Sequence, residues 1–214
     1  PRVRRQRQMC IRDRANAGGT IGPLPTLYYE YDRNDRRRDI SCVPFRWNGG
    51  RQELENIQKW YSGKYRYEWM DEVISGNDCG IKPIVMRYAD VLLMAAEAAN
   101  ELNDLPYAKT QLRKVRYRAF KSDEAVDKYL EGIGSKDAMF KAIYRERMLE
   151  FSCEQIRKQD LIRWGLLKAS LDDAKNKMKA MLDHTPYTSE LTGKTYDFSL
   201  VGTKVYYKYA ADGE

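Results

Sequence analysis

The stretch "YADVLLMAAEAANEL", Tyr88 to Leu102, decides the fold of this chain. Its apolar residues recur at i, i+3, i+4 and i+7, which is the spacing of one face of an α-helix. We expect that face to point inward, and its alanines to let a second helix approach closely. The residues on the predicted inward face are Val91, Leu92, Ala95, Ala98, Ala99 and Leu102.

A second helix is predicted directly after the first. The turn "NDLP", residues 103–106, breaks the pattern, and proline is favoured in the first turn of a helix. Two helices joined by so short a turn form an antiparallel hairpin similar to a tetratricopeptide unit, and one such unit cannot bury its own apolar face. The second helix, Tyr107–Phe120, would turn Ala108, Leu112, Val115 and Ala119 inward.

More helices are predicted toward the C-terminus. Ser135 is a good N-cap for a helix over Lys136–Cys153. The segment "EQIRKQDLIRWG" continues to Gly165, and "LLKASLDDAKNKMKAML" is typical of a further amphipathic helix. Alternating aromatic segments after residue 186 predict a hairpin or an extended edge. The residues expected to point inward from helix 136–153 are Met139, Phe140, Ile143 and Leu149.

The chain from Ala15 to about Gly80 has a different texture, rich in turns and aromatic residues. "TLYYEYD" and "GKYRYEWM" favour short strands or extended segments, and "ELENIQKWY" between them favours a short helix. Aromatic rings offer apolar area with a polar rim, which suits the faces of a sugar. The alternative, that most of these rings belong to the core, stays open. The candidate glycan-binding residues are Trp47 and Asn48 in "PFRWNGG", with Tyr28, Tyr29, Trp60 and Tyr61.

The N-terminal segment, residues 1–14, is strongly basic, and "RRQRQMCIRDR" could be a nucleic-acid-binding arm. It lacks helical or strand periodicity and any aromatic residue for stacking. Its residues resemble the translation of one reading frame of a common sequencing-library adaptor. We therefore interpret it as a disordered artefact and assign residues 15–214 to the protein, as part of a longer domain. Without its six arginines and one aspartate, the formal net charge falls from +7 to +2, which gives no reason to expect nucleic acid as a partner.

The remaining composition argues against an enzyme, a metal protein and a membrane-spanning protein. Apolar residues make up 43% of the chain, but no run of 18 exists. The three cysteines outside residues 1–14 are far apart, and His184 is the single histidine, expected at a helix end in a capping or solvated role. No phosphate-binding, dinucleotide-binding or hydrolase motif occurs, so we expect no catalytic residues, no metal and no cofactor.

Three glutamates, Glu146, Glu150 and Glu154, follow one another at i, i+4 spacing and share one helix face. They could form a metal site or a glycosidase acid/base pair. Glycosidases, however, hold their carboxyls across a cleft, which residues stacked on one helix rarely provide. Nearby arginines favour a structural network of ion pairs instead. We predict that network to contain Arg87, Glu146, Arg147, Glu150, Glu154, Arg157, Asp160, Arg163 and Trp164.

Two of these segments, "IKPIVMRYADVLLMAAEAANELN" and "ERMLEFSCEQIRKQDLIRWG", resemble the C-terminal half of the SusD/RagB family. The stretch "NDRRRD" is similar to a third family segment, with Arg36 in place of a proline. The family usually has glycine and histidine where this chain has Gln155 and Ile156, and its closing stretch rich in proline and asparagine is absent.

The resemblance implies a mainly α fold, SusD-like, with a tetratricopeptide-type helical hairpin, a loop-rich lobe and a few short strands. It also implies a non-catalytic, surface-exposed outer-membrane lipoprotein of Bacteroidetes-type bacteria. Such a protein binds oligosaccharides, or in some cases peptides, and delivers them to a SusC-like TonB-dependent transporter. The signal peptide and lipid-anchor cysteine would precede this chain.

The alternative from another class is an intracellular tetratricopeptide-type scaffold that binds a peptide or protein partner. It would need tandem repeats upstream and no lipoprotein signal.

Overall fold

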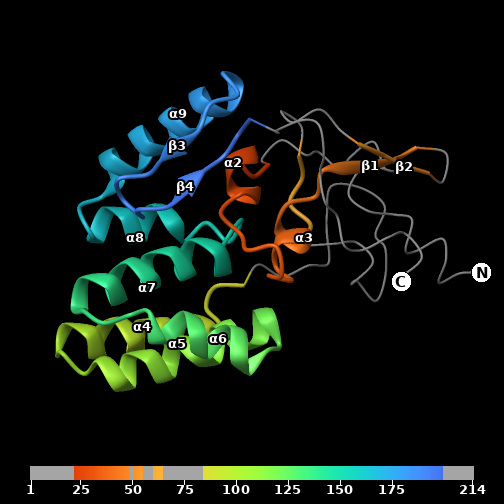
Figure 1. Ribbon diagram of the computed structural model, residues 1–214. Coiled ribbons are helices and arrows are strands. Elements are labelled where there is room, and N and C mark those ends of the chain that lie inside the picture. Colours follow the sequence, from red (N-terminus) through yellow and green to blue (C-terminus); the bar gives the residue numbers. More distant parts are fainter. Residues whose placement is uncertain (1–21, 49–50, 55–59, 65–83, 200–214) are drawn as a thin grey trace, which may run out of the picture.

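The computed structural model describes residues 22–48, 51–54, 60–64 and 84–199, and for residues 46–48 and 51–54 it describes the backbone alone. The described part is mainly helical with two short hairpins, which confirms the predicted fold class. Figure 1 shows α4, α5 and α6 in one layer, α7 across them, and α8 and α9 on the other side of α7.

The first layer is built on the predicted helical hairpin. Helix α4 spans Tyr88–Glu101 and α5 spans Leu105–Phe120. The Asp104 carboxylate caps α5 by accepting a hydrogen bond from the Tyr107 backbone N–H at 3.1 Å, and Pro106 lies in the first turn. The predicted inward face of α5 is confirmed, because Ala108, Leu112, Val115 and Ala119 are all buried.

The predicted inward face of α4 is largely wrong. Only Leu92 and Ala99 of the six residues are buried, whereas Val91, Ala98 and Leu102 are exposed. Because α4 is apolar around most of its circumference, two stripes compete for the core. The stripe that was not predicted faces the core. Its two polar residues are paired there: Asp90 binds Arg147, and the Asn100 amide donates to the Lys136 carbonyl at 3.1 Å. The buried apolar residues are Ala89, Leu92, Leu93, Ala96 and Ala99.

Helix α6, Asp123–Glu131, completes the first layer and was not anticipated from the sequence. The sequence does contain residues typical of a helix start at this position. Ser122 is the N-cap, whose hydroxyl accepts a hydrogen bond from the Ala125 N–H at 3.3 Å, and two acidic residues occupy the first turn. The helix buries Val126 and Leu130 against the hairpin.

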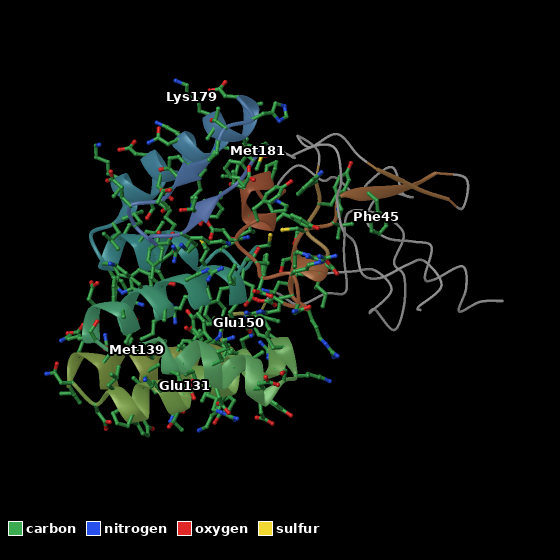
Figure 2. The ribbon with its side chains drawn as sticks, viewed as in Figure 1. Phe45, Glu131, Met139, Glu150, Lys179 and Met181 are labelled. Carbon is green, nitrogen blue, oxygen red and sulfur yellow. The ribbon has the colours of Figure 1, made fainter. Side chains whose placement is uncertain are left out.

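Helix α7 spans Lys136–Glu150 and runs through the middle of the molecule. Ser135 caps it as predicted, accepting from the Ala138 N–H at 3.1 Å. Met139 and Glu150 lie near its two ends in Figure 2. Of the predicted inward residues, Met139, Ile143 and Leu149 are buried, and Phe140 is half-buried with its ring 5.4 Å from that of Trp164.

The helix ends three residues before the predicted Cys153. A tight turn follows it, in which Cys153 and Gln155 both have positive φ, 64° and 63°. Gln155 is the position where the family usually carries glycine, the residue that tolerates this conformation best.

Helices α8, Arg157–Arg163, and α9, Leu167–Leu182, follow as predicted, with Gly165 (φ 68°) between them. His184 is exposed in a left-handed conformation after α9, as expected for a residue at a helix end. The predicted C-terminal hairpin is present as β3, Tyr187–Thr188, and β4, Thr195–Tyr196.

The described residues between positions 22 and 64 form the loop-rich lobe. It contains α2, Pro25–Tyr28, α3, Arg38–Ser41, and the hairpin of β1, Phe45–Asn48, with β2, Arg51–Leu54. The prediction of a strand over "TLYYEYD" is wrong, because Pro25 starts a helical turn there. The predicted helix over "ELENIQKWY" begins instead as β2, and its last residue, Tyr61, pairs with Val43.

Several predictions fall outside the described residues. They include the proposed artefact at 1–14 and the segment "GKYRYEWM" beyond Lys64.

Candidate functional site

A buried cluster of charges lies where the lobe meets α7. Glu146 and Glu150, one helical turn apart, are 0% and 1% exposed. One guanidinium nitrogen of Arg37, Nη1, donates to both carboxylates at 2.7 Å. The other nitrogens of Arg37 bind the Asp35 carboxylate at 2.7 and 2.9 Å, which fixes the guanidinium in place. The lobe therefore supplies the central cation for two carboxylates of the helix.

More cations complete the cluster, from α5, from the segment before α4 and from the lobe. Arg116 donates to the second oxygen of Glu146 at 2.7 Å. Arg87 and Arg118 both bind Glu150. Arg87 also forms a bidentate pair with Glu154 at 2.8 and 2.9 Å, and Lys64 binds the same carboxylate.

The cluster keeps its carboxylates ionised. Burial alone would raise the pKa of Glu150, but the charges of Arg37, Arg87 and Arg118 outweigh it and lower that pKa to about 2. The pKa of Glu146 is also lowered, by Arg37 and Arg116 against the same burial. A carboxylate that is buried, fully paired and ionised cannot exchange a proton near neutral pH. This geometry thus favours a structural role over acid/base chemistry.

A second set of charges joins α7 to α4 and α8. Arg147 binds Asp90 and Asp160, each at 2.7 Å. On the adjoining surface, Arg163 binds Asp160 at 3.0 Å and also Glu97.

Aromatic rings complete this second set. The Trp164 indole N–H donates to Glu97 at 2.7 Å. The Arg157 guanidinium lies 4.0 Å from the centre of the Tyr144 ring and donates to the Tyr144 carbonyl. All nine residues expected in the network therefore make polar contacts within or beside these two sets.

Several members of the first cluster were not assigned from the sequence, namely Asp35, Arg37, Lys64, Arg116 and Arg118. Arg116 carried a usable signal, because it follows Val115 on the inward side of a predicted amphipathic helix, where an arginine needs a buried acid.

The aromatic candidates for a ligand site divide into three groups. Tyr28, Trp60 and Tyr61 are buried, and the Tyr28 and Trp60 rings meet edge to face at 5.4 Å beside Leu149. As ligand contacts these three are corrected to core residues, since a buried ring has no face free for a sugar. Tyr29 is half-buried, with its ring 5.5 Å from that of Phe198.

Trp47 and Asn48 form the third group, at the end of β1. Their backbones pair with Gln52 and Arg51. The glycines of "PFRWNGG" predict a turn-like segment here, but residues 45–48 form a strand, followed in the sequence by Gly49-Gly50. Their side chains lie outside the described part of the structure. In Figure 1 the β1–β2 hairpin projects away from the helical layers.

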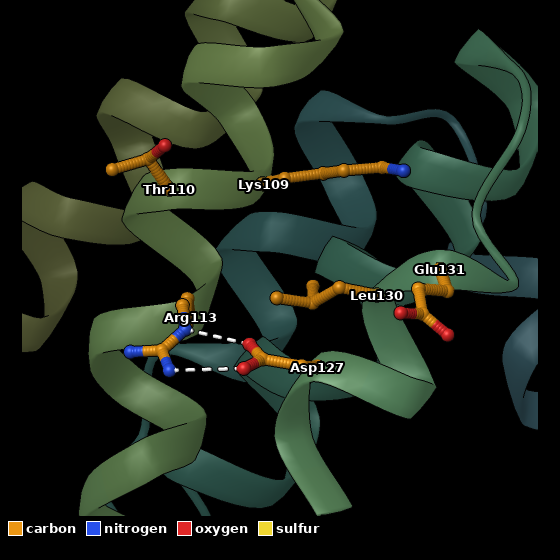
Figure 3. A pocket seen from close by; sticks show the side chains of 6 residues that line it. All are labelled: Lys109, Thr110, Arg113, Asp127, Leu130 and Glu131. Atoms are coloured by element: carbon orange, nitrogen blue, oxygen red, sulfur yellow. Dashed lines mark hydrogen bonds and ion pairs between the residues drawn. The ribbon is translucent and has the colours of Figure 1, made fainter. Parts of the chain in front are cut away.

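A small open depression of about 240 Å³ lies between α5 and α6. Figure 3 shows Arg113 and Asp127 joined across one end of it, at 2.7 Å, with Leu130 between the helices. Two of its four charged lining residues are thus paired with each other, and the depression was not predicted. The lining residues are Lys109, Thr110, Arg113, Asp127, Leu130 and Glu131.

Within the described ranges, no group of histidine, cysteine, aspartate and glutamate side chains could hold a metal ion. None of the helices described has the length and apolar character to cross a membrane.

Comparison with known proteins shows which family the sequence resembles. The model of the SusD family matches residues 43–209. A stretch of 90 residues is 44% identical to the SusD-like protein P25 of Formosa agariphila; it makes up 42% of this chain and 16% of that protein's length. No solved structure matches the chain.

Proposed function

This chain belongs to the SusD family, as its two helical motifs indicated, and on that premise we propose that it binds oligosaccharides at the bacterial cell surface. The family match carries the proposal. It favours a binding protein over an enzyme, and it favours this function over the intracellular tetratricopeptide-type scaffold. The buried, fully paired glutamates are in line with a non-catalytic role.

The proposal includes the partners that such a protein requires. The bound glycan passes to a SusC-like TonB-dependent transporter, and a lipid anchor on the longer polypeptide holds the protein at the outer membrane. No cofactor or metal takes part.

We place the glycan contact on the β1–β2 hairpin, at Trp47 and Asn48, with Tyr29 as the nearest remaining candidate. Two observations support this choice. The hairpin projects from the helical layers (Figure 1), and the burial of Tyr28, Trp60 and Tyr61 withdraws the other candidates. An indole stacked on one sugar ring buries roughly 100 Å² of apolar area, worth about 2 kcal/mol before ordering costs.

Calorimetry on the complete protein tests both levels of the proposal. Against a panel of plant, host and microbial oligosaccharides, at least one should bind. Trp47→Ala should weaken that binding by about tenfold at an unchanged thermal midpoint. The matched control is Tyr107→Ala, an exposed tyrosine on α5 that should leave affinity unchanged.

Glycan binding and its placement on the β1–β2 hairpin can be contradicted independently. If no glycan in the panel binds, the proposed function is contradicted. If a glycan binds and Trp47→Ala leaves its affinity intact, the function stands and the placement on the hairpin does not.

A further inference from the structure

The side chain of Glu30 is buried where the lobe meets α9 and the β3–β4 hairpin, and only one of its two oxygens is bonded. The residue is 3% exposed. Its Oε1 accepts hydrogen bonds from Lys177 of α9 at 2.5 Å and from the Tyr196 hydroxyl of β4 at 2.6 Å. Its Oε2 is also buried and has no hydrogen-bond partner among the described residues. Because a buried carboxylate oxygen without a donor is costly, Oε2 requires a donor in the interior.

Arg145 of α7 carries a buried donor beside this carboxylate. Its Nη2 donates to the Glu30 carbonyl oxygen at 2.6 Å, whereas its Nε is buried and has no partner among those same residues. The N–H groups of Nε and Nη2 lie on one edge of the planar guanidinium and point in the same direction. The Nε proton is therefore directed at the space next to the Glu30 carbonyl.

Other arginines of this chain show how that edge is filled when an acid faces it. Arg37 binds Asp35 through both Nε and Nη2, and Arg113 binds Asp127 in the same way. In Arg145 the carbonyl oxygen occupies the Nη2 position alone. The Nε position of its edge thus remains for a further acceptor.

Lys194, in the turn between β3 and β4, brings a second donor to the same place. Its Nζ donates to the carbonyls of Tyr29 and Glu30, at 2.5 and 3.2 Å, so it shares the Glu30 carbonyl with Arg145. An ammonium has three N–H groups, which leaves one for another acceptor. Burial and then the charge of Arg145 lower the pKa of Lys194, and the charge of Glu30 opposes them, so the three groups lie within electrostatic reach of one another.

We infer that one buried water molecule binds at this junction, donating to Glu30 Oε2 and accepting from Arg145 Nε, with Lys194 as its third partner. The charges of the three groups favour water over an ion. A metal cation or an ammonium ion would face two positive side chains, and an anion would face the carboxylate. A neutral molecule that both donates and accepts suits all three. Buried waters in proteins typically make about three hydrogen bonds to polar groups that lack other partners.

The water joins three segments that are far apart in the sequence. Glu30 directly follows the first turns of the lobe, Arg145 belongs to α7, and Lys194 belongs to the C-terminal hairpin. In Figure 1, α2 and β4 lie between α9 and α7, where these segments meet. With the water in place both oxygens of Glu30 have donors, and the hairpin is fixed to the lobe next to Tyr29.

A crystal structure of the complete protein, at a resolution that shows ordered waters, identifies the occupant. The expected result is a water oxygen within about 3.2 Å of both Glu30 Oε2 and Arg145 Nε. A direct hydrogen bond between these two atoms, an ion at this position, or a water bonded to only one of them would overturn the inference.

Oxygen-17 relaxation dispersion tests the site in solution, because it detects waters that are held inside a protein. Arg145→Met keeps the apolar stem and removes the N–H groups, so the amplitude should fall by the contribution of about one water. The matched control is Arg113→Met, in which the lost edge was filled by Asp127. If Arg145→Met does not fold, Glu30→Gln, which keeps the size of the side chain and removes its charge, should show the same loss. An amplitude equal to that of the control would contradict the inference.

Discussion

Two buried charge clusters hold the helices to the lobe, and they are built from different chemistry. In the first, Glu146 and Glu150 are surrounded by guanidinium groups. The second cluster is centred on Glu30 and is separate from the Arg147 set described above. One carboxylate oxygen of Glu30 accepts hydrogen bonds from Lys177 at 2.5 Å and from the Tyr196 hydroxyl at 2.6 Å. Its other oxygen, Oε2, has no hydrogen-bond partner among the described residues. In the first cluster, every carboxylate oxygen of Glu146 and Glu150 thus has a donor, whereas in the second cluster one oxygen of Glu30 has none among the described residues. We call the first cluster the saturated cluster.

The surroundings of Glu30 reinforce the contrast. Lys194 donates to the carbonyls of Tyr29 and Glu30, at 2.5 and 3.2 Å, and Arg145 donates to the Glu30 carbonyl at 2.6 Å. Burial, and then the charge of Arg145, lower the pKa of Lys194 to about 8. Arginine keeps its proton in a buried site, while lysine can lose it, so the two clusters should differ in strength and in their response to pH.

Among the substitutions considered, removing a carboxylate from the saturated cluster should lower the free energy of unfolding most. Glu150→Ala leaves the cations of Arg37 and Arg87 without one of their acids in a buried place. We expect the free energy of unfolding to fall by about 3–5 kcal/mol. Urea denaturation of the complete protein measures it, with Glu131→Ala on exposed α6 surface as the control. A loss below that of the control would show that the network does not stabilise the fold.

Removing the carboxylate of the second cluster should cost less. Glu30→Ala leaves Lys177 with a partner, because Asp173 binds it at 2.9 Å. The Tyr196 hydroxyl then loses its carboxylate acceptor, for which a loss of about 1–3 kcal/mol is typical. The same denaturation series checks the order, and a greater loss for Glu30→Ala than for Glu150→Ala would reverse the comparison.

The two clusters should also respond at opposite ends of the pH scale. The folded pKa of Glu150 is depressed from 4.5 to about 2, so its contribution is present above pH 4.5 and is lost as the pH falls toward 2. The folded pKa of Lys194 is depressed from 10.5 to about 8. Between these values the unfolded chain holds the proton that the folded one has lost, so this contribution to stability rises with pH.

Unfolding free energies measured from pH 2 to 10 test both signs. Lys194→Met should reduce the rise between pH 8 and 10 and leave the acid limb unchanged. Burial also lowers the pKa of Lys64 in the first cluster, so Lys64 contributes the rest of the rise. The window ends near pH 10 because burial and Glu30 raise the pKa of Tyr196, which then favours the unfolded state at higher pH. A Lys194→Met variant with an undiminished rise would assign the rise to Lys64 or to another group.

The smallest effect is expected in the turn that follows the saturated cluster. Gln155 is exposed and has a φ of 63°, a conformation that costs a side chain about 1 kcal/mol and glycine little. Gln155→Gly should raise the free energy of unfolding by a few tenths to about 1 kcal/mol, less than the loss in either cluster. Gln159→Gly in α8, where glycine is disfavoured, is the opposite control. A destabilised Gln155→Gly would show that the glutamine is not strained.

Periodicity predicted the helices well where only one face is apolar. The inward face of α5 and the caps at Asp104 and Ser135 could be predicted, because each rests on local chemistry. The face of α4 could not, because an almost uniformly apolar helix offers two stripes and only its neighbours choose between them.

The candidate site shows the same division. The acids of α7 and their role in ion pairs could be predicted from spacing, but the identity of the cations depended on contacts such as Arg37 to Glu146, 109 residues apart. Among the aromatic residues, composition alone could not separate Trp60, in the core, from a ring that faces solvent. Burial is set by tertiary packing, and no local signal in "ELENIQKWY" carries it.

The position of Arg37 has a consequence for how the molecule comes apart. Its guanidinium belongs to the lobe but binds two carboxylates of α7, so detachment of the lobe from folded helices would take one cation away from both Glu146 and Glu150. Partial opening at this boundary therefore breaks buried ion pairs, which makes it costly. The lobe around α3 and the centre of α7 form one cooperative unit, and their slowest amide protons should exchange with solvent in the same opening event.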